Sequence, residues 1–544
     1  SVPQTIRLMM LSLLLLAAGE TFSQAPGDYR SAVATGNWNS LASWERYNGS
    51  SWVTPTGGQG TPTNASGAIT IQAGHTITVT ANVSVDQVTV ASTGKVTVNN
   101  VTLTIANGSG TDFTVNGTLE LTGGAGAITT TGTLAFNSGG TYIHNRDGSG
   151  IPTATWNAAS TCSVTGVIST LPTNTTFDQP FGNFTWNSTN QTADLSLAAN
   201  LTTVNGNMTV SSTGSGSLRL SNSGASDVLT VGGNFSQTGG TFYIGGTLGS
   251  NTWTVDVAGD FSLTGGTLNM NGNSGSSTLN LAGDFTASAG VLTETGSGTN
   301  TINFDGTASQ TYTSGSTISN AINFNVNNGA TLQMATASTV VSGGGSFTVS
   351  NGGTLGVTSA VGITTTGATG NIQVTGTRTY SSGANYIYNG SANQVTGNGL
   401  TQNTPANLTI DNANTVTLSA ATTITGNILI SQGTLSTSAS NFNITLDGTW
   451  TNNGSFTAGA STTTFSGTTQ SIGGTNSTTF AALVIDNGSA TTMNNSNTCS
   501  SLSFTAGGSA SSLTHGGSSV LTVNGAVTLN QPTGNATKAW NINA

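Results

Sequence analysis

Apolar and polar residues alternate along most of the chain from Ala68 onward. Pairs such as Ile69 and Ile71, or Ile77 and Val79, are separated by a single residue, which is usually Thr, Ser, Asn or Glu. A period of two places the apolar side chains on one face of a β-strand. Turns containing Gly or Asn follow each short run, and no stretch after residue 23 has the apolar spacing of an amphipathic helix. The pattern predicts an all-β protein built from short strands.

A longer repeat distinguishes a β-solenoid from a β-sandwich. Residues 229–235, 255–261 and 279–285 share a short alternating run, a glycine, an Asn or Asp and a final phenylalanine. These phenylalanines lie 26 and 24 positions apart. A unit of about 25 residues with two or three strands has the size of one β-helix coil. The sequence therefore predicts a parallel β-helix (β-solenoid) with coils of about 25 residues, and the general preference for right-handed crossovers predicts a right-handed one.

Changes in composition predict five segments. Residues 1–23 have the features of a secretory signal peptide, in which Arg7 precedes an apolar run that is shorter than the roughly 20 residues of a membrane span. Residues 24–65, which are rich in Trp, Pro and Gly, are predicted to form an N-terminal cap on the open strand edge. The remainder is predicted to form a first β-solenoid segment at 66–170, an irregular connection at 171–200 and a second β-solenoid segment at 201–544. We expect the last segment to be incomplete at its C-terminus.

The charge content limits the partners that the chain can have. Only 5% of the 544 residues are charged, the formal net charge is -10, and the few basic residues are scattered along the sequence. Such a chain cannot neutralise several phosphates at once, so nucleic acid is excluded as a partner. The apolar content is 35%, higher than in typical disordered chains, which predicts that the chain folds. Cys162 and Cys499 are expected to be small buried apolar residues, without a disulfide.

Several segments resemble a known group of proteins. They are Gly36-Asn37-Trp38 with Ser43-Trp44, the run Ile69 to Val79, Tyr142 to Asp147, Ile151 to Trp156 and Phe181 to Trp186. They are similar to segments of large secreted bacterial β-helix proteins of the type IX secretion group, whose N-terminal module is related to the eight-glycine domain. The resemblance implies an adhesin or surface-structure role. It also implies export through a C-terminal sorting domain, which residues 1–544 lack, so either that domain is missing here or the export route differs.

Catalytic chemistry on a β-helix needs clustered charged residues. Polysaccharide lyases of this shape use acidic calcium ligands with a basic residue, and hydrolases use two carboxylates. The nearest match is Asp256, Asp260 and Asp284, which we consider as a possible cation site. Because Asn234 occupies the equivalent position in the preceding repeat, a ladder of turn residues is the alternative interpretation. No catalytic residues, metal site or cofactor are predicted.

Two further groups are candidates for ligand binding. His144, Arg146 and Asp147 form the densest polar cluster of the sequence, either as a site or as a surface loop with satisfied hydrogen bonds. Trp38, Trp44 and Trp52 are candidates for stacking on sugar rings if they are exposed, and cap core residues if they are buried. Thr-x-Thr runs such as Thr76 to Thr80 are also typical of ice-binding solenoids, although the variable coil length argues against that function.

The sequence as a whole predicts a secreted, extracellular or outer-surface protein. We expect a structural or adhesin-like β-solenoid that is not an enzyme and that contacts glycans, host surfaces or abiotic surfaces, without a membrane span. The alternative is a carbohydrate-binding or polysaccharide-degrading β-helix of the lyase or hydrolase kind, and a more distant one is an ice-binding solenoid.

Overall fold

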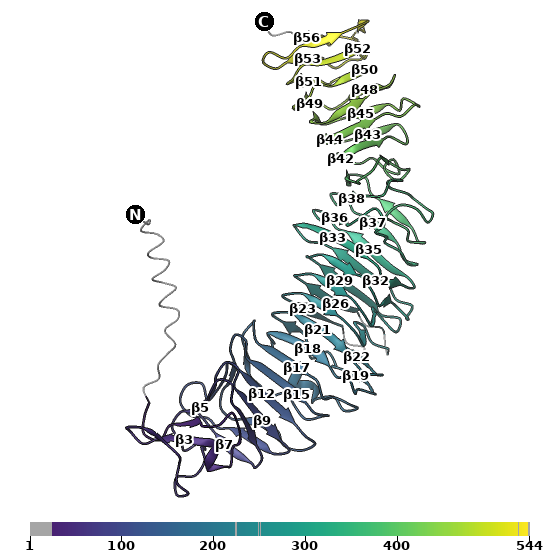
Figure 1. Ribbon diagram of the computed structural model, residues 1–544. Coiled ribbons are helices and arrows are strands. Elements are labelled where there is room, and N and C mark those ends of the chain that lie inside the picture. Colours follow the sequence, from purple (N-terminus) through teal and green to yellow (C-terminus); the bar gives the residue numbers. More distant parts are fainter. Residues whose placement is uncertain (1–23, 223–225, 248–249, 251, 531, 542–544) are drawn as a thin grey trace, which may run out of the picture. The chain divides into compact units, whose positions relative to one another are not determined.

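The computed structural model describes residues 24–222, 226–247, 250, 252–530 and 532–541. The predicted signal peptide lies outside these residues. The described part is almost entirely β-strand, with two short 3-10 helices, η1 (Leu41–Ser43) and η2 (Asn174–Phe177), and no α-helix. The strands belong to stacked parallel coils of about 23 residues, which confirms the predicted β-solenoid (Figure 1). Its handedness stays a prediction. The chain divides into two compact units, one ending at Val167 and one beginning at Ile168.

The described residues of the first unit form three sheets, built mainly from equivalent strands of successive coils. Sheet 1 contains β1 (Tyr29–Ser31), β3 (Trp44–Tyr47), β4 (Trp52–Val53), β5 (Ile69–Ile71), β8 (Val88–Val90), β11 (Phe113–Val115), β14 (Leu134–Phe136) and β16 (Thr155–Trp156). Sheet 2 contains β2 (Thr35–Asn37), β6 (Thr76–Val79), β9 (Lys95–Asn99), β12 (Thr118–Thr122), β15 (Thr141–Asn145) and β17 (Thr161–Val164). Sheet 3 contains β7 (Val83–Val85), β10 (Thr102–Ile105) and β13 (Ala127–Thr130). Strands β5, β6 and β7 therefore make one triangular coil.

The N-terminal residues of this unit pair differently from the coils. Strand β1 pairs antiparallel with β3, which pairs antiparallel with β4, while β1 also pairs in parallel with β5 of the first coil. This small antiparallel ribbon lies within the predicted cap at 24–65. It covers the strand edge that an open solenoid would otherwise present to other chains.

The described residues of the second unit form four sheets. Sheet 4 contains β18 (Asn183–Asn187), β21 (Met208–Ser212), β24 (Phe235–Gln237), β27 (Phe261–Leu263), β30 (Phe285–Ala287), β33 (Ser309–Ser314), β36 (Thr331–Met334), β38 (Thr354–Val357), β40 (Asn385–Tyr388), β41 (Gln394–Val395), β42 (Asn407–Thr417), β44 (Ile428–Ser436), β46 (Trp450–Asn452), β47 (Ser455–Thr457), β49 (Thr469–Gly473), β51 (Ala490–Met493), β53 (Ser511–His515) and β56 (Lys538–Asn541). Sheet 5 contains β20 (Thr203–Val204), β23 (Asp227–Val231), β26 (Thr252–Val257), β29 (Ser276–Leu281), β32 (Asn300–Phe304), β35 (Ile322–Val326), β37 (Phe347–Val349) and β39 (Arg378–Tyr380). Sheet 6 contains β19 (Asp194–Ser196), β22 (Ser217–Arg219), β25 (Thr241–Tyr243), β28 (Thr267–Asn269), β31 (Val291–Thr293) and β34 (Thr317–Ile318). Sheet 7 contains β43 (Thr422–Ile424), β45 (Ile444–Leu446), β48 (Thr462–Phe465), β50 (Thr479–Ile485), β52 (Asn497–Phe504), β54 (Leu521–Val523) and β55 (Val527–Leu529).

The repeated phenylalanines form a column inside the second unit. Phe235 pairs in register with Phe261, and Phe261 with Phe285, so the spacing of 26 and 24 residues corresponds to one coil each. Tyr312 continues the column in β33. The ring centroids of Phe261 and Phe285 lie 5.2 Å apart and those of Phe285 and Tyr312 lie 4.7 Å apart, both stacked. All four rings are fully buried.

Glycines form tight corners where successive coils approach each other. Gly266 has a positive φ of 73°, and a Cβ atom added to it would lie 2.2 Å from the carbonyl oxygen of Gly240 in the coil below. Any other residue would have a strained backbone at this corner, and its Cβ would overlap the Gly240 carbonyl oxygen. Gly240 also has a positive φ, of 70°, so the Gly239-Gly240 and Gly265-Gly266 pairs both form tight coil corners.

Residues 171–200 are more regular than the sequence led us to expect. They contain η2, β18 and β19, and both strands pair in parallel with the next coil. Their apolar residues, including Phe184 and Trp186, point into the core as in the other coils. The sequence did not reveal this because the strands are short and the turns between them differ from the later Gly-Asn-Phe repeat. Both cysteines, Cys162 and Cys499, are buried free thiols, as predicted.

Candidate functional site

Two of the three candidate tryptophans lie in the core of the cap. Trp38 and Trp44 are 0% exposed, and their ring centroids lie 4.8 Å apart. Each indole N–H is used internally, since Trp38 donates to the Pro62 carbonyl and Trp44 to the Trp38 carbonyl. They cannot stack on a sugar, because both rings are buried in the core of the cap. Trp52 is half-buried, and the Arg30 guanidinium lies 4.5 Å from its ring centroid, which covers one face.

His144 is a core residue and not part of an accessible cluster. It lies in β15 at an inward position, 0% exposed, where strand alternation also places Tyr142. Its Nε2 is 2.8 Å from the Gly148 carbonyl oxygen, which can only accept, so Nε2 carries the proton and Nδ1 accepts from the Tyr142 hydroxyl at 3.1 Å. Burial lowers the pKa of His144 to about 4. The ring is neutral at pH 7 and is closed to ligands.

Arg146 also has a structural role. Its Nη1 donates to the carbonyls of Ala125 and Gly126 at 2.8 and 2.7 Å, and its Nη2 donates to Gly124 at 3.0 Å. The side chain therefore clamps the turn of the preceding coil. Asp147 follows it in the turn after β15 and is half-buried. The cluster that the sequence identified is thus divided between the core and a turn.

The acidic candidates Asp260 and Asp284 belong to a ladder of turn residues. The Oδ1 of Asp260 accepts a hydrogen bond from the backbone N–H of Asp284 at 2.9 Å, and the Oδ1 of Asp284 accepts one from Thr311 at 2.7 Å. Asn234 makes the same contact one coil earlier and Asn207 makes it two coils earlier, each at 2.8 Å. Because asparagine performs the same function, the carboxylate charge is not required. Asp260 and Asp284 therefore act as turn acceptors in this ladder.

Asp256 lies apart from this ladder, in an outward column of sheet 5. Asn280 donates its Nδ2 to the Asp256 Oδ1 at 2.7 Å, and Asn303 continues the column by donating to Asn280 at 2.8 Å. Burial, followed by the charge of Asp256, raises the pKa of Asp305. Within the described ranges, no group of three or more His, Cys, Asp or Glu side chains is placed to hold a metal ion. The structure does not bring the three candidate aspartates together.

A pair of substitutions tests the turn-ladder role of the aspartates. In Asp260→Asn and Asp284→Asn the amide oxygen accepts the same hydrogen bond, so we expect the free energy of unfolding to change by less than about 0.5 kcal/mol. Asp260→Ala leaves the Asp284 N–H without its acceptor and should cost about 1 kcal/mol. Urea unfolding with and without Ca²⁺ measures both effects. Stabilisation by Ca²⁺ that disappears in the Asn variants would mean that the carboxylates form a cation site after all.

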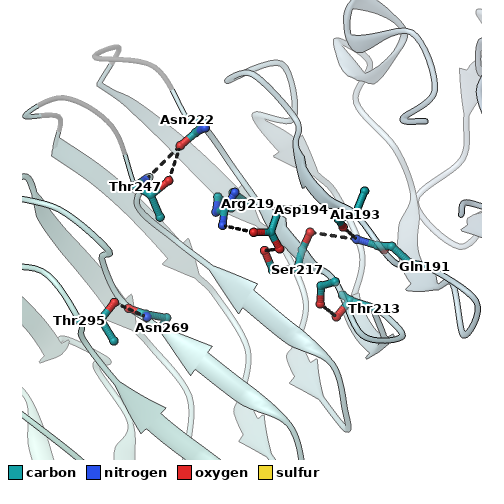
Figure 2. Close-up of polar contacts among 11 residues, drawn as sticks. Gln191, Ala193, Asp194, Thr213, Ser217, Arg219, Asn222, Thr247, Asn269 and Thr295 are labelled. Carbon is teal, nitrogen blue, oxygen red and sulfur yellow. Dashed lines mark hydrogen bonds and ion pairs between the residues drawn. The ribbon is translucent and has the colours of Figure 1, made fainter. Parts of the chain in front are cut away.

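Sheet 6 carries a different polar cluster, shown in Figure 2. Asp194 accepts hydrogen bonds from Ser217 at 2.7 Å and from Arg219 Nη2 at 3.0 Å, across neighbouring coils. The bond from Ser217, with a smaller contribution from Arg219, holds the pKa of Asp194 below its usual range. The Arg219 guanidinium also lies 4.9 Å from the Tyr243 ring centroid. Arg219 is therefore held by an acid and an aromatic ring, which is a structural arrangement.

The coils around residues 358–406 depart most from the regular stack. No strand occurs between the end of β38 at Val357 and the start of β39 at Arg378, and Val341 makes only an isolated bridge with Ile372. Two pockets open on this region. One, of about 370 Å³, is lined by uncharged residues including Gln402, Asn403 and Ala421. The other, of about 330 Å³, is lined by loop residues including Thr366 and Ala368, together with Arg378.

Arg378 is the residue that our sequence analysis missed. It is 3% exposed at an inward position of β39, in register with the core residue Phe347. Burial lowers the pKa of Arg378 below its usual value, although a guanidinium remains charged at neutral pH. The sequence feature that could have identified Arg378 is that it is the only charged residue between Asp305 and Asp411. A single charge in a long uncharged stretch needs a specific environment.

Comparisons with known proteins give no family. No family model matches the sequence, and neither a curated protein nor a solved structure shows significant similarity to it.

Among the described residues, no helix is long and apolar enough to span a membrane.

Proposed function

We propose that this protein is an extracellular or outer-surface β-solenoid with a structural, adhesin-like role, which binds neutral glycans along its sheets and does not catalyse a reaction. The main support for this proposal is a column of hydroxyl groups on sheet 4. One outward position in six consecutive coils is occupied by Thr185, Thr209, Ser236, Ser262, Thr286 and Thr313. All six side chains are half-buried, so they line the surface without entering the core.

The geometry of such a column suits a repeating polymer. Paired strands lie about 4.8 Å apart, so the same hydroxyl recurs at that interval along the sheet. Hydroxyl groups both donate and accept hydrogen bonds, as sugars do. The aspartates that a hydrolase or lyase would need serve instead as turn residues and as a member of an asparagine column. These features support binding without turnover. The predicted signal peptide supports a location outside the cell.

The proposal is tested by a glycan-array screen of residues 24–544. We expect retention of one or more linear neutral glycans. Binding should depend little on salt concentration, because a neutral glycan has no charge for salt to screen. Ser262→Lys places a bulky charge in the middle of the column and should weaken binding. Thr464→Lys makes a comparable change at a half-buried position of sheet 7 and should leave it unchanged. Absence of binding to every glycan would contradict the proposal, and thermal hysteresis of ice growth would favour an ice-binding function instead.

A further inference from the structure

The guanidinium of Arg378 donates hydrogen bonds to neutral groups alone. Its Nε and Nη2 donate to the Val374 carbonyl at 3.2 and 3.0 Å, and its Nη1 donates to the carbonyl and hydroxyl of Thr364 at 3.2 and 2.7 Å. Nη2 also donates to the Gly367 carbonyl. These five contacts satisfy the hydrogen bonds, but none of the acceptors is an anion.

This environment is unusual for a buried cation. Buried charges are normally paired with an opposite charge, because dipoles only partly replace the lost hydration. The other strongly buried arginine of the second unit, Arg219, has such a partner in Asp194 at 3.0 Å. Arg378 has none among the described residues, and the sequence offers no acidic residue between Asp305 and Asp411. The site therefore has an unbalanced positive charge.

Arg378 is among the residues that line a pocket of about 330 Å³, which is at the small end of the range of ligand sites. Its other lining residues include Thr365, Thr366, Gln373 and Thr375, and no carboxylate lines it. Thr366, Gly367 and Ala368 are exposed, so the loop tip that covers the guanidinium lies at the surface. An anion that entered the pocket would approach a positive charge that no acidic side chain balances.

We propose that this pocket binds the carboxylate of an acidic sugar, such as a uronic acid residue within a polysaccharide. The planar fork of a guanidinium matches a carboxylate in two parallel hydrogen bonds. The carboxylate takes the place of the neutral Thr364 and Gly367 oxygens on the outer edge of Arg378. Hydrogen bonds to a charged acceptor, which are stronger, then replace the bonds to neutral oxygens. The threonine hydroxyls and Gln373 then contact the sugar ring. The inference rests on the proposed glycan-binding function and adds a second, acidic class of ligand.

The test compares trigalacturonate with its fully methyl-esterified form by isothermal titration calorimetry on residues 24–544. In the esterified probe each carboxylate is an uncharged methyl ester, and this loss of charge should weaken binding about tenfold or more. Ala368→Trp fills the pocket at an exposed loop position without altering Arg378 and should abolish trigalacturonate binding. Ala421→Trp fills the neighbouring uncharged pocket in the same way and should not affect it. Because Arg378→Met removes all five hydrogen bonds that the guanidinium donates, Ala368→Trp is the deciding variant.

The remaining outcomes separate this inference from the proposed function. Equal binding of both probes, or trigalacturonate binding that survives Ala368→Trp, would overturn the acidic-sugar site while leaving the neutral-glycan result intact. Inorganic sulfate that binds as tightly as trigalacturonate, and is also blocked by Ala368→Trp, would overturn the assignment to a carboxylate sugar. Trigalacturonate binding without any neutral glycan binding on the array would support the pocket and contradict the sheet 4 proposal.

Discussion

Replacing Phe285 with alanine is expected to destabilise the second unit by about 3 to 5 kcal/mol, the usual cost of removing a buried aromatic ring. Phe285 is 0% exposed, and its ring stacks between Phe261 at 5.2 Å and Tyr312 at 4.7 Å. Its loss leaves a cavity that three coils share, and a solenoid coil is stabilised only by its neighbours. The lost hydrophobic contacts cannot be replaced locally.

Urea unfolding and amide hydrogen exchange measure this effect. Exchange should accelerate first in β27, β30 and β33, the strands that hold the column. Thr286→Ala is the matched control, because Thr286 is adjacent in sequence but points outward, and it should change stability by less than about 0.5 kcal/mol. Equal effects of the two substitutions would mean that the column does not organise the core.

Acidification is expected to destabilise the first unit through His144. The pKa of His144 is lowered by burial to about 4 in the folded state, whereas an unfolded histidine titrates near 6.5. Between these values the unfolded chain binds a proton that the folded chain excludes. The stabilising contribution is therefore complete above about pH 6.5 and is lost as the pH falls towards 4, by about 3 kcal/mol in total.

Urea unfolding of the unmodified protein and of His144→Gln over this pH range isolates the contribution of His144. The variant cannot take up a proton, so its stability should lack the step between pH 6.5 and 4.5 that the unmodified protein shows. Asp112 and Glu120 also have lowered pKa values, because hydrogen bonds to their carboxylates outweigh the effect of burial. They lose their stabilising effect at lower pH, below the histidine step. An identical pH profile in both proteins would show that His144 is not buried as a neutral ring.

The fold could be predicted from the sequence because each coil repeats its own signals. The alternation around Ile69 and Ile77 identified strands, and the spacing of Phe235, Phe261 and Phe285 identified the coil length. These are local or periodic features, which survive without knowledge of the tertiary contacts.

The details of the sites were less accessible to sequence analysis. His144 was grouped with Arg146 and Asp147 by proximity in sequence, but strand alternation turns His144 inward and leaves the other two in the following turn. Arg378 was passed over because its burial depends on how the strandless residues 358–377 fold over it. Periodic patterns do not encode the course of such a loop.

We propose that this β-solenoid binds glycans without cleaving them. The most direct test incubates residues 24–544 with each polysaccharide that it retains and measures the release of reducing ends and of unsaturated sugars. We expect binding with no product above a protein-free control. Product release would contradict it, most directly if Asp260→Asn or Asp284→Asn abolished the activity, since both residues serve here only as turn acceptors.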